Sequence, residues 1–186
     1  AEDALILGIS GRYEFKNKGI DVFIDAMGQL NRNNGLGKEV LAFILVPAGH
    51  AGANKELLHN LELPYQAVTS TDLYLTHYLN DSANDPVMNR IRAQKLRNSE
   101  EDKVKIFFVP SYLNGDDGVL NMPYYDLLVG MDLTAFPSYY EPWGYTPLES
   151  LAFKVPTITT TLAGFGLWVK EHYNMNHPGI EVIHRE

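Results

Sequence analysis

Two glutamates with seven residues between them, Glu141 and Glu149, are the residues best placed for chemistry in this sequence. They lie in the segment FPSYYEPWGYTPLE, residues 136–149. Glu141 falls on a predicted loop and Glu149 in the first turn of a predicted helix, so both carboxylates can face one cavity beyond the preceding strand. The alternative is a solvated loop carboxylate and a helix-capping residue, and for an arbitrary pair at this spacing the alternative is favoured.

The start of that helix is marked by the sequence TPLE. Thr146 and Glu149 form a capping-box pattern, and Pro147 suits the first helical position, where its missing N–H costs nothing. The pattern predicts a helix that begins at Pro147. The backbone N–H groups of residues 143–145 would then lie at the positive end of the helix dipole, and Gly144 has no Cβ to crowd a ligand. An anion site is therefore predicted here.

The loop around Glu141 is unusually rich in large aromatic side chains. Such side chains are costly to display in a loop that also contains Pro and Gly, unless they line a pocket. This context favours the functional interpretation of the two glutamates. The aromatic residues are Tyr139, Tyr140, Trp143 and Tyr145.

Two cations, Arg12 and Lys18, lie on the predicted loop after the first strand, and Gly19 follows them. They can converge on one anion and stabilise the charge that develops on a leaving group. The spacing alone leaves the alternative of two surface cations equally open.

The composition indicates a soluble protein of one domain. At 186 residues the chain suits one core, and its formal net charge of −8 argues against nucleic acid or an anionic membrane as a partner. The sequence has no cysteine, no apolar run of about 18 residues and no signal-peptide pattern. We expect a cytoplasmic protein, because the lack of cysteine is compatible with a reducing compartment.

Alternating strand and helix signals predict an α/β fold, a Rossmann-like parallel sheet with helices on both faces. Short apolar runs predict buried strands, at residues 4–9, 40–46, 104–109, 133–136, 156–159 and 180–183. Helical spacing predicts helices, at residues 20–30, 124–131, from 147, and at 167–173.

Residues 53–103 are predicted to form a helical insertion. Their apolar positions have helical spacing between turn signals, at Leu73, Leu75, Tyr78 and Leu79, then Val87, Ile91 and Leu96. We favour a solvated lid or an oligomer contact without chemistry, which leaves a homo-oligomer open.

No metal site is predicted. Asp116 and Asp117 in NGDDG lack a third acidic ligand at calcium-loop spacing and a neighbouring His in the sequence, so a solvated turn is favoured. The six histidines show no zinc-binding spacing.

SYYEPWGYTP, the E-x7-E spacing and the later TTTLAGFG together resemble the retaining glycosyltransferases of the glycogen synthase family, specifically the animal and fungal UDP-glucose type. The resemblance implies that residues 1–186 are the C-terminal nucleotide-sugar-binding domain of a two-domain GT-B enzyme. The N-terminal acceptor domain would then be absent from this chain, which also begins without Met.

The same resemblance implies a role for each matching residue. Glu141 would contact the transferred glucose and Glu149 the ribose, while the backbone N–H groups of Gly144 to Thr146 would hold the diphosphate. The pattern G-R-x-E-F-x-N-K-G is similar to that of the family. It implies that Arg12 and Lys18 neutralise the diphosphate as the sugar–oxygen bond breaks.

Two further assignments come from the resemblance. Tyr124 would stack on the nucleotide base, with its neighbour Tyr125 as the alternative by one position. Gly164, Phe165 and Gly166 would lie against the donor sugar, or would only form a turn.

The implied activity is transfer of glucose from UDP-glucose to the non-reducing end of an α-1,4-glucan, with retention and without a cofactor. UDP-glucose is favoured over ADP-glucose because the loop matches the UDP-using branch. One alternative is another retaining nucleotide-sugar transferase, of the sucrose or trehalose-phosphate type. The other is that the chain alone binds nucleotide without catalysis, since the glucan would be held by the missing domain.

Overall fold

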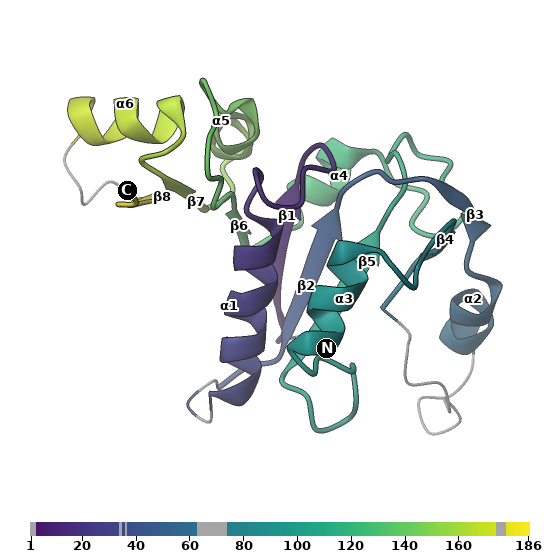
Figure 1. Cartoon of the computed structure of the whole chain (residues 1–186). Helices are drawn as coiled ribbons and strands as arrows, with labels where there is room; N and C mark the ends of the chain where they lie inside the picture. The colour runs from purple at the N-terminus through teal and green to yellow at the C-terminus, as the bar shows by residue number, and fades with distance from the viewer. Residues whose placement is uncertain (1–2, 34, 36, 63–73, 174–177) are drawn as a thin grey trace.

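A six-stranded parallel sheet forms the centre of the structure (Figure 1). The computed structural model describes residues 3–33, 35, 37–62, 74–173 and 178–186. Counted along the chain, the strands of this sheet lie in the order 3-2-1-4-5-6, the doubly wound order of Rossmann folds. The predicted Rossmann-like α/β fold is therefore confirmed. From edge to edge the strands are β5 (Val104–Val109), β2 (Val40–Leu45), β1 (Leu5–Ser10), β6 (Leu133–Ala135), β7 (Thr157–Thr160) and β8 (Ile180–Ile183).

Helices cover both faces of the sheet. On one face α1 (Ile20–Arg32) and α3 (Pro86–Ala93) lie side by side, as Figure 1 shows. On the other face α4 (Tyr124–Leu128) packs against the opposite side chains of the same strands. Alternation along the strands produces these two cores, because successive side chains point to opposite faces. In β2, for example, Ile44 belongs to the first core and Leu45 to the second.

The last two helices are α5 (Tyr145–Ala152) and α6 (Gly164–His172). A buried set of hydroxyl groups fixes α5 on the sheet. The Ser150 Oγ lies 2.7 Å from the Thr134 Oγ1 and 2.9 Å from the Thr157 Oγ1. Because buried hydroxyls need partners, this set holds the helix in one position over β6 and β7.

The predicted helical insertion, residues 53–103, is only partly helical in its first half. α2 (Lys55–Glu62) is a helix as predicted, but β4 (His77–Leu79) is a strand that pairs antiparallel with β3 (His50–Ala53). Leu75 pairs with Phe108 of β5, and Leu73 lies outside the described residues. The backbone of residues 75–79 therefore bonds to neighbouring strands, which overrides the helical spacing of the apolar side chains.

The second half of the segment is part of the core rather than a solvated lid. α3 connects β2 to β5 on the face covered by α1, and its N-cap Asp85 accepts a hydrogen bond from the Met88 N–H at 2.9 Å. Side chains of this part are almost completely buried, at Val87, Met88, Ile91 and Leu96. Among the described residues, no helix is long and apolar enough to cross a membrane.

Candidate functional site

A cavity of about 710 Å³ opens beyond the carboxyl ends of β1 and β6. These two neighbouring strands mark the point where the strand order reverses, and doubly wound sheets bind ligands there. Seven predicted site residues line the cavity, from the loop after β1 and from the loop after β6 with the start of α5: Arg12, Lys18, Glu141, Trp143, Gly144, Tyr145 and Thr146.

A second cavity of about 320 Å³ adjoins the first. The two share Gly11, Pro47, Tyr112 and Thr146, so together they form one elongated cleft. Predicted Tyr124 lines the second cavity, and its hydroxyl lies 2.7 Å from the Ser10 Oγ.

Lys18 and Glu141 form an ion pair in the wall of the first cavity. Only 12% of the Lys18 side chain and 13% of the Glu141 side chain are exposed. Burial lowers the pKa of Lys18. The nearby Glu14 carboxylate raises this pKa, and the Arg12 guanidinium lowers it further. The two predicted catalytic groups therefore meet directly in a partly desolvated place, where charges interact strongly.

Arg12 lines the same cavity, but its side chain is far more exposed to solvent than that of Lys18. Its side chain is 79% exposed and pairs with Glu14 at 3.0 Å. Exposed ion pairs contribute little free energy, so Arg12 can turn toward an anion in the cavity at small cost.

The two loops that carry these residues are held together by close backbone contacts. The Tyr139 N–H donates to the Asn17 carbonyl at 2.8 Å. Gly19 has φ 70°, and a Cβ there would collide with the Pro137 carbonyl oxygen. Glycine at this position thus lets the α1 loop approach the β6 loop closely enough for Lys18 to reach Glu141.

The predicted capping box at α5 is wrong. The helix begins at Tyr145, two residues before Pro147, and its N-cap is Gly144 with φ 97° and no side-chain hydrogen bond. The left-handed conformation, which glycine adopts readily, allows the earlier start. Glu149 is consequently in the second turn, and the alternative that it serves only as a cap fails as well.

The start of α5 nonetheless presents backbone N–H groups to the cavity, which the predicted anion site requires. Within the described part of the chain, no group accepts a hydrogen bond from the backbone N–H groups of Gly144, Tyr145 or Thr146. All three residues line the first cavity. Unpaired N–H groups at a helix N-terminus attract negative charge.

Glu149 lines neither cavity. It lies close enough to Tyr124 to affect its titration: burial raises the pKa of the Tyr124 hydroxyl, Ser10 lowers it and Glu149 raises it. Glu149 is thus an electrostatic neighbour of Tyr124, which lines the second cavity.

The segment Gly164–Gly166 is the first turn of α6, not a turn before a helix that starts at residue 167. A Cβ on Gly164 would collide with the Pro142 carbonyl oxygen. The N–H groups of Gly164 and Phe165 donate to the carbonyls of Glu141 and Trp143 at 3.1 and 2.7 Å. These residues line neither of the two cavities, and the two hydrogen bonds tie the Glu141 loop to the start of α6.

Sequence reasoning missed several cavity residues, among them Tyr13, Pro47 and Tyr112. They follow the carboxyl ends of β1, β2 and β5, which is the signal that could have found them.

Tyr13 also connects the cavity to α3. Its hydroxyl donates a hydrogen bond to the N-cap Asp85. Burial and this contact raise the pKa of Tyr13.

The described residues contain no group of three or more side chains suited to hold a metal ion. The prediction of a solvated turn at NGDDG is wrong for Asp117, whose side chain is fully buried beside His77. The reason is that Asp117 accepts hydrogen bonds from three backbone N–H groups of its own loop.

The fold and the site define the class of this protein: a doubly wound α/β domain with a cleft at the switch point of its sheet. A sequence model described as glycogen synthase matches residues 1–73 and 66–186. The chain therefore belongs to the glycogen synthase family.

Similar proteins agree with this assignment. The chain is 32% identical over 247 aligned residues to glycogen [starch] synthase isoform 2 of Saccharomyces cerevisiae. This alignment covers 99% of this chain and 35% of that protein. It is 32% identical over 239 residues to the Neurospora crassa glycogen [starch] synthase, with 99% and 34% covered. For the liver enzyme of Rattus norvegicus the identity is 31% over 221 residues, with 92% and 31% covered. The chain thus spans about a third of the length of these relatives.

Among solved structures, WaaG, described as a glycosyltransferase involved in lipopolysaccharide biosynthesis, aligns with all of this chain and 35% of its own. The TM-score is 0.48 and the identity 18%. A similarity of this size bears on neither activity nor ligand.

Proposed function

We propose that residues 1–186 are the C-terminal nucleotide-sugar-binding domain of a glycogen synthase with the two-domain GT-B architecture. The full protein would transfer glucose from UDP-glucose to the non-reducing end of an α-1,4-glucan, with retention. One observation carries the proposal: Arg12, the Lys18–Glu141 pair and the unpaired N–H groups at the α5 start face one cavity at the switch point.

The shape of the cleft suggests how the donor is divided between its two parts. The diphosphate would lie in the larger cavity, where three N–H donors and two cations can hold it. The base and ribose would occupy the smaller cavity beside Tyr124, and Glu149, an electrostatic neighbour of Tyr124, would reach the ribose. Glu141 would then orient the glucose near the diphosphate.

In this arrangement, catalysis rests on charge stabilisation of the leaving diphosphate. Lys18 and Arg12 can bind the phosphate oxygens as negative charge grows on them, and the α5 dipole adds to the effect. Glu141 would hold the sugar rather than attack it, since the departing phosphate can assist an acceptor that enters on the same face.

The remaining expectations belong to the same proposal. The glucan acceptor would bind through an N-terminal domain, and no cofactor or metal would be needed. The protein would work in the cytoplasm, bind neither nucleic acid nor membrane, and could assemble as a homo-oligomer. UDP is the expected nucleotide, with ADP as the weaker ligand.

Titration calorimetry with UDP and ADP tests the proposal directly. UDP should bind, and Arg12→Ala should weaken it by about 2 kcal/mol because an Arg–diphosphate contact in a partly desolvated cleft is lost. Thermal stability should not change, since Arg12 is 79% exposed. Lys38→Ala is the matched control, because Lys38 pairs with Asp3 away from the cleft. Equal UDP affinity in both variants would remove Arg12 from the site.

A second candidate function is nucleotide binding without transfer by the chain alone. It is favoured by the coverage, since about two thirds of each relative has no counterpart here. Incorporation of radiolabelled glucose into glycogen by these 186 residues would refute it.

A further inference from the structure

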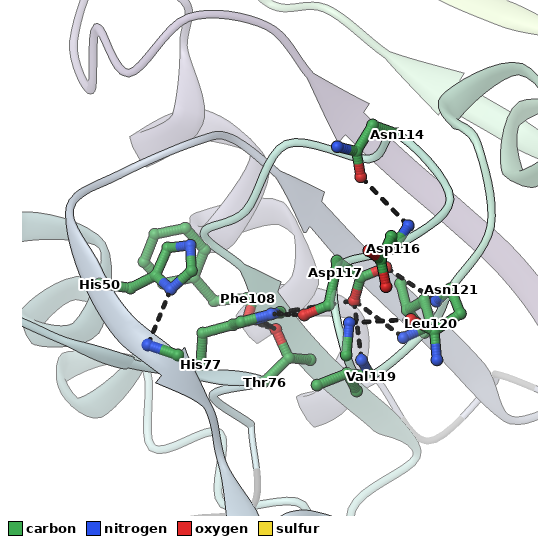
Figure 2. A network of polar contacts seen from close by, with 12 residues as sticks. His50, Thr76, His77, Phe108, Asn114, Asp116, Asp117, Val119, Leu120 and Asn121 are labelled. Atoms are coloured by element: carbon green, nitrogen blue, oxygen red, sulfur yellow. Dashed lines mark hydrogen bonds and ion pairs between the residues drawn. The ribbon is translucent and has the colours of Figure 1, made fainter.

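A buried polar cluster lies outside the cleft, between the β3–β4 pair and the loop that follows β5 (Figure 2). His77 of β4 and Asp117 of the loop are at its centre, and both side chains are completely buried. Neither lines the larger or the smaller cavity of the cleft. Burying two titratable groups is costly unless their polar atoms have partners, so their contacts indicate what they do.

Both ring nitrogens of His77 are engaged. The Nε2 atom lies 2.8 Å from the backbone carbonyl oxygen of Asp117, and the Nδ1 atom lies 2.8 Å from the Thr76 Oγ1. A carbonyl oxygen can only accept, so Nε2 carries a proton and donates it. The Thr76 hydroxyl can donate either to Nδ1 or to the Phe108 carbonyl at 3.2 Å, and in both cases the ring orientation is fixed.

Asp117 organises the turn on the other side of this contact. Its carboxylate accepts hydrogen bonds from the N–H groups of Val119, Leu120 and Asn121 at 3.0, 2.9 and 2.8 Å. Burial alone would raise the pKa of Asp117, but these three donors, with His77, lower it. Asp117 therefore remains a carboxylate, and its Oδ1 lies 3.8 Å from the His77 Nε2.

His50 completes the cluster as a neutral neighbour. Its ring packs against the edge of the His77 ring with centroids 4.6 Å apart, and its Nδ1 accepts a hydrogen bond from the Gly52 N–H at 3.1 Å. Burial and the proximity of His77 lower the pKa of His50. The β3–β4 pair thus presents one rigid donor, the His77 Nε2, to the loop.

The same loop forms one wall of the smaller cavity. Ser111, Tyr112, Leu113 and Asn114 line that cavity, a few residues before Asp117. The loop is closed on itself, because Asn114 pairs with Pro123 and its Oδ1 accepts a hydrogen bond from the Asp116 N–H at 3.1 Å. A displacement at Asp117 would therefore move the wall.

We propose that His77 is a positioning residue for the nucleotide: it holds the carbonyl of Asp117 and thereby fixes the wall of the smaller cavity. The inference rests on the proposed function, in which that cavity takes the base and ribose. Tyr112 of this loop also lines the larger cavity, but the groups proposed to hold the diphosphate should not depend on His77, since the cations and the α5 start belong to other parts of the chain.

The test compares His77→Leu, which removes the donor, with His77→Gln, whose side-chain amide can restore it. Calorimetry uses two probes, UDP and inorganic pyrophosphate. We expect His77→Leu to weaken UDP binding about tenfold, because the wall of the smaller cavity would have to be ordered on binding, and to leave pyrophosphate affinity unchanged. His77→Gln should recover most of the UDP affinity. His59→Leu on the exposed face of α2 is the matched control.

Each outcome has a definite meaning. Equal UDP affinity in folded His77→Leu and the unsubstituted chain overturns the inference alone, as does an equal loss for UDP and pyrophosphate. Failure of the unsubstituted chain to bind UDP overturns the proposed function and removes the basis of the inference with it. If His77→Leu does not fold, His77→Phe, which keeps a ring of similar shape but removes the donor to the Asp117 carbonyl, replaces it. A several-fold loss of affinity for UDP alone supports the inference, and no loss contradicts it.

Discussion

The starts of α5 and α6 offer the same chemical groups and use them differently. At α5 the N–H groups of residues 144–146 face the cavity without an acceptor among the described residues. At α6 the N–H groups of Gly164 and Phe165 are bonded to the carbonyls of Glu141 and Trp143. A helix N-terminus therefore becomes an anion site only where the preceding loop leaves its donors unpaired.

The turn at Asp117 is a third arrangement of such donors. There, three consecutive N–H groups are occupied by a carboxylate of the protein itself. Of the three, only the start of α5 keeps its N–H groups available to an external anion. The start of α6 instead uses its N–H groups to hold the loop before α5 in place.

Among the substitutions that test this comparison, Gly164→Ala has the largest expected effect. The new Cβ would collide with the Pro142 carbonyl oxygen, so the Glu141 loop or α6 must shift. We expect a loss of about 2–3 kcal/mol in the free energy of unfolding, the cost of overpacking, and a loss of UDP affinity. Chemical denaturation and calorimetry measure the two effects.

Gly37→Ala is the matched control for that substitution, because a Cβ at Gly37 meets nothing within 4 Å. If Gly164→Ala were as stable as Gly37→Ala and bound UDP normally, α6 would not support the site.

A smaller effect is expected for Glu149→Gln. The carboxylate does not cap α5, since the cap has no side-chain hydrogen bond. Stability should therefore be unchanged, while UDP affinity falls by about 1 kcal/mol through a weaker contact with the ribose hydroxyls. Thermal unfolding and calorimetry with UDP provide the two measurements. Loss of stability with unchanged affinity would return Glu149 to a purely structural role.

The smallest effect is the acid sensitivity of the Asp117 turn. Because the folded protein lowers the pKa of Asp117, its carboxylate contributes stability above the ordinary carboxyl pKa, and this contribution is lost as the pH falls. The difference in unfolding free energy between the unsubstituted chain and Asp117→Asn should therefore shrink below about pH 4. Denaturation curves at several pH values measure it, and a difference independent of pH would contradict the role given to the carboxylate.

Much of the fold could be read from the sequence, because buried parallel strands are short and strongly apolar. All six strands of the main sheet were predicted within about two residues at either end, and α1 was predicted from its helical spacing. The helical spacing around Leu75 and Tyr78 misled the prediction because Thr76 forms a backbone hydrogen bond with the distant Phe108, at 3.1 Å. A partner 32 positions away leaves no local signal.

For the site, the sequence predicted which chemical groups meet, but not how the surrounding helices hold them. Arg12, Lys18, Glu141 and the N–H groups near Gly144 meet in one cavity as expected. The start of α5 was misplaced because TPLE has a capping pattern that the left-handed Gly144 overrides. The supporting role of Gly164 was not visible, since it depends on the position of the Pro142 carbonyl.

The sequence by itself determined the parallel α/β fold, the acidic overall charge and the identity of the charged groups after the first and fourth strands of the sheet. Periodicity and residue type carry that information locally. Only the tertiary structure decided that Lys18 pairs with Glu141, that the α6 donors are already bonded, and that His77 meets Asp117. These contacts join residues far apart along the chain, so the packing of loops at the edge of the sheet determines them.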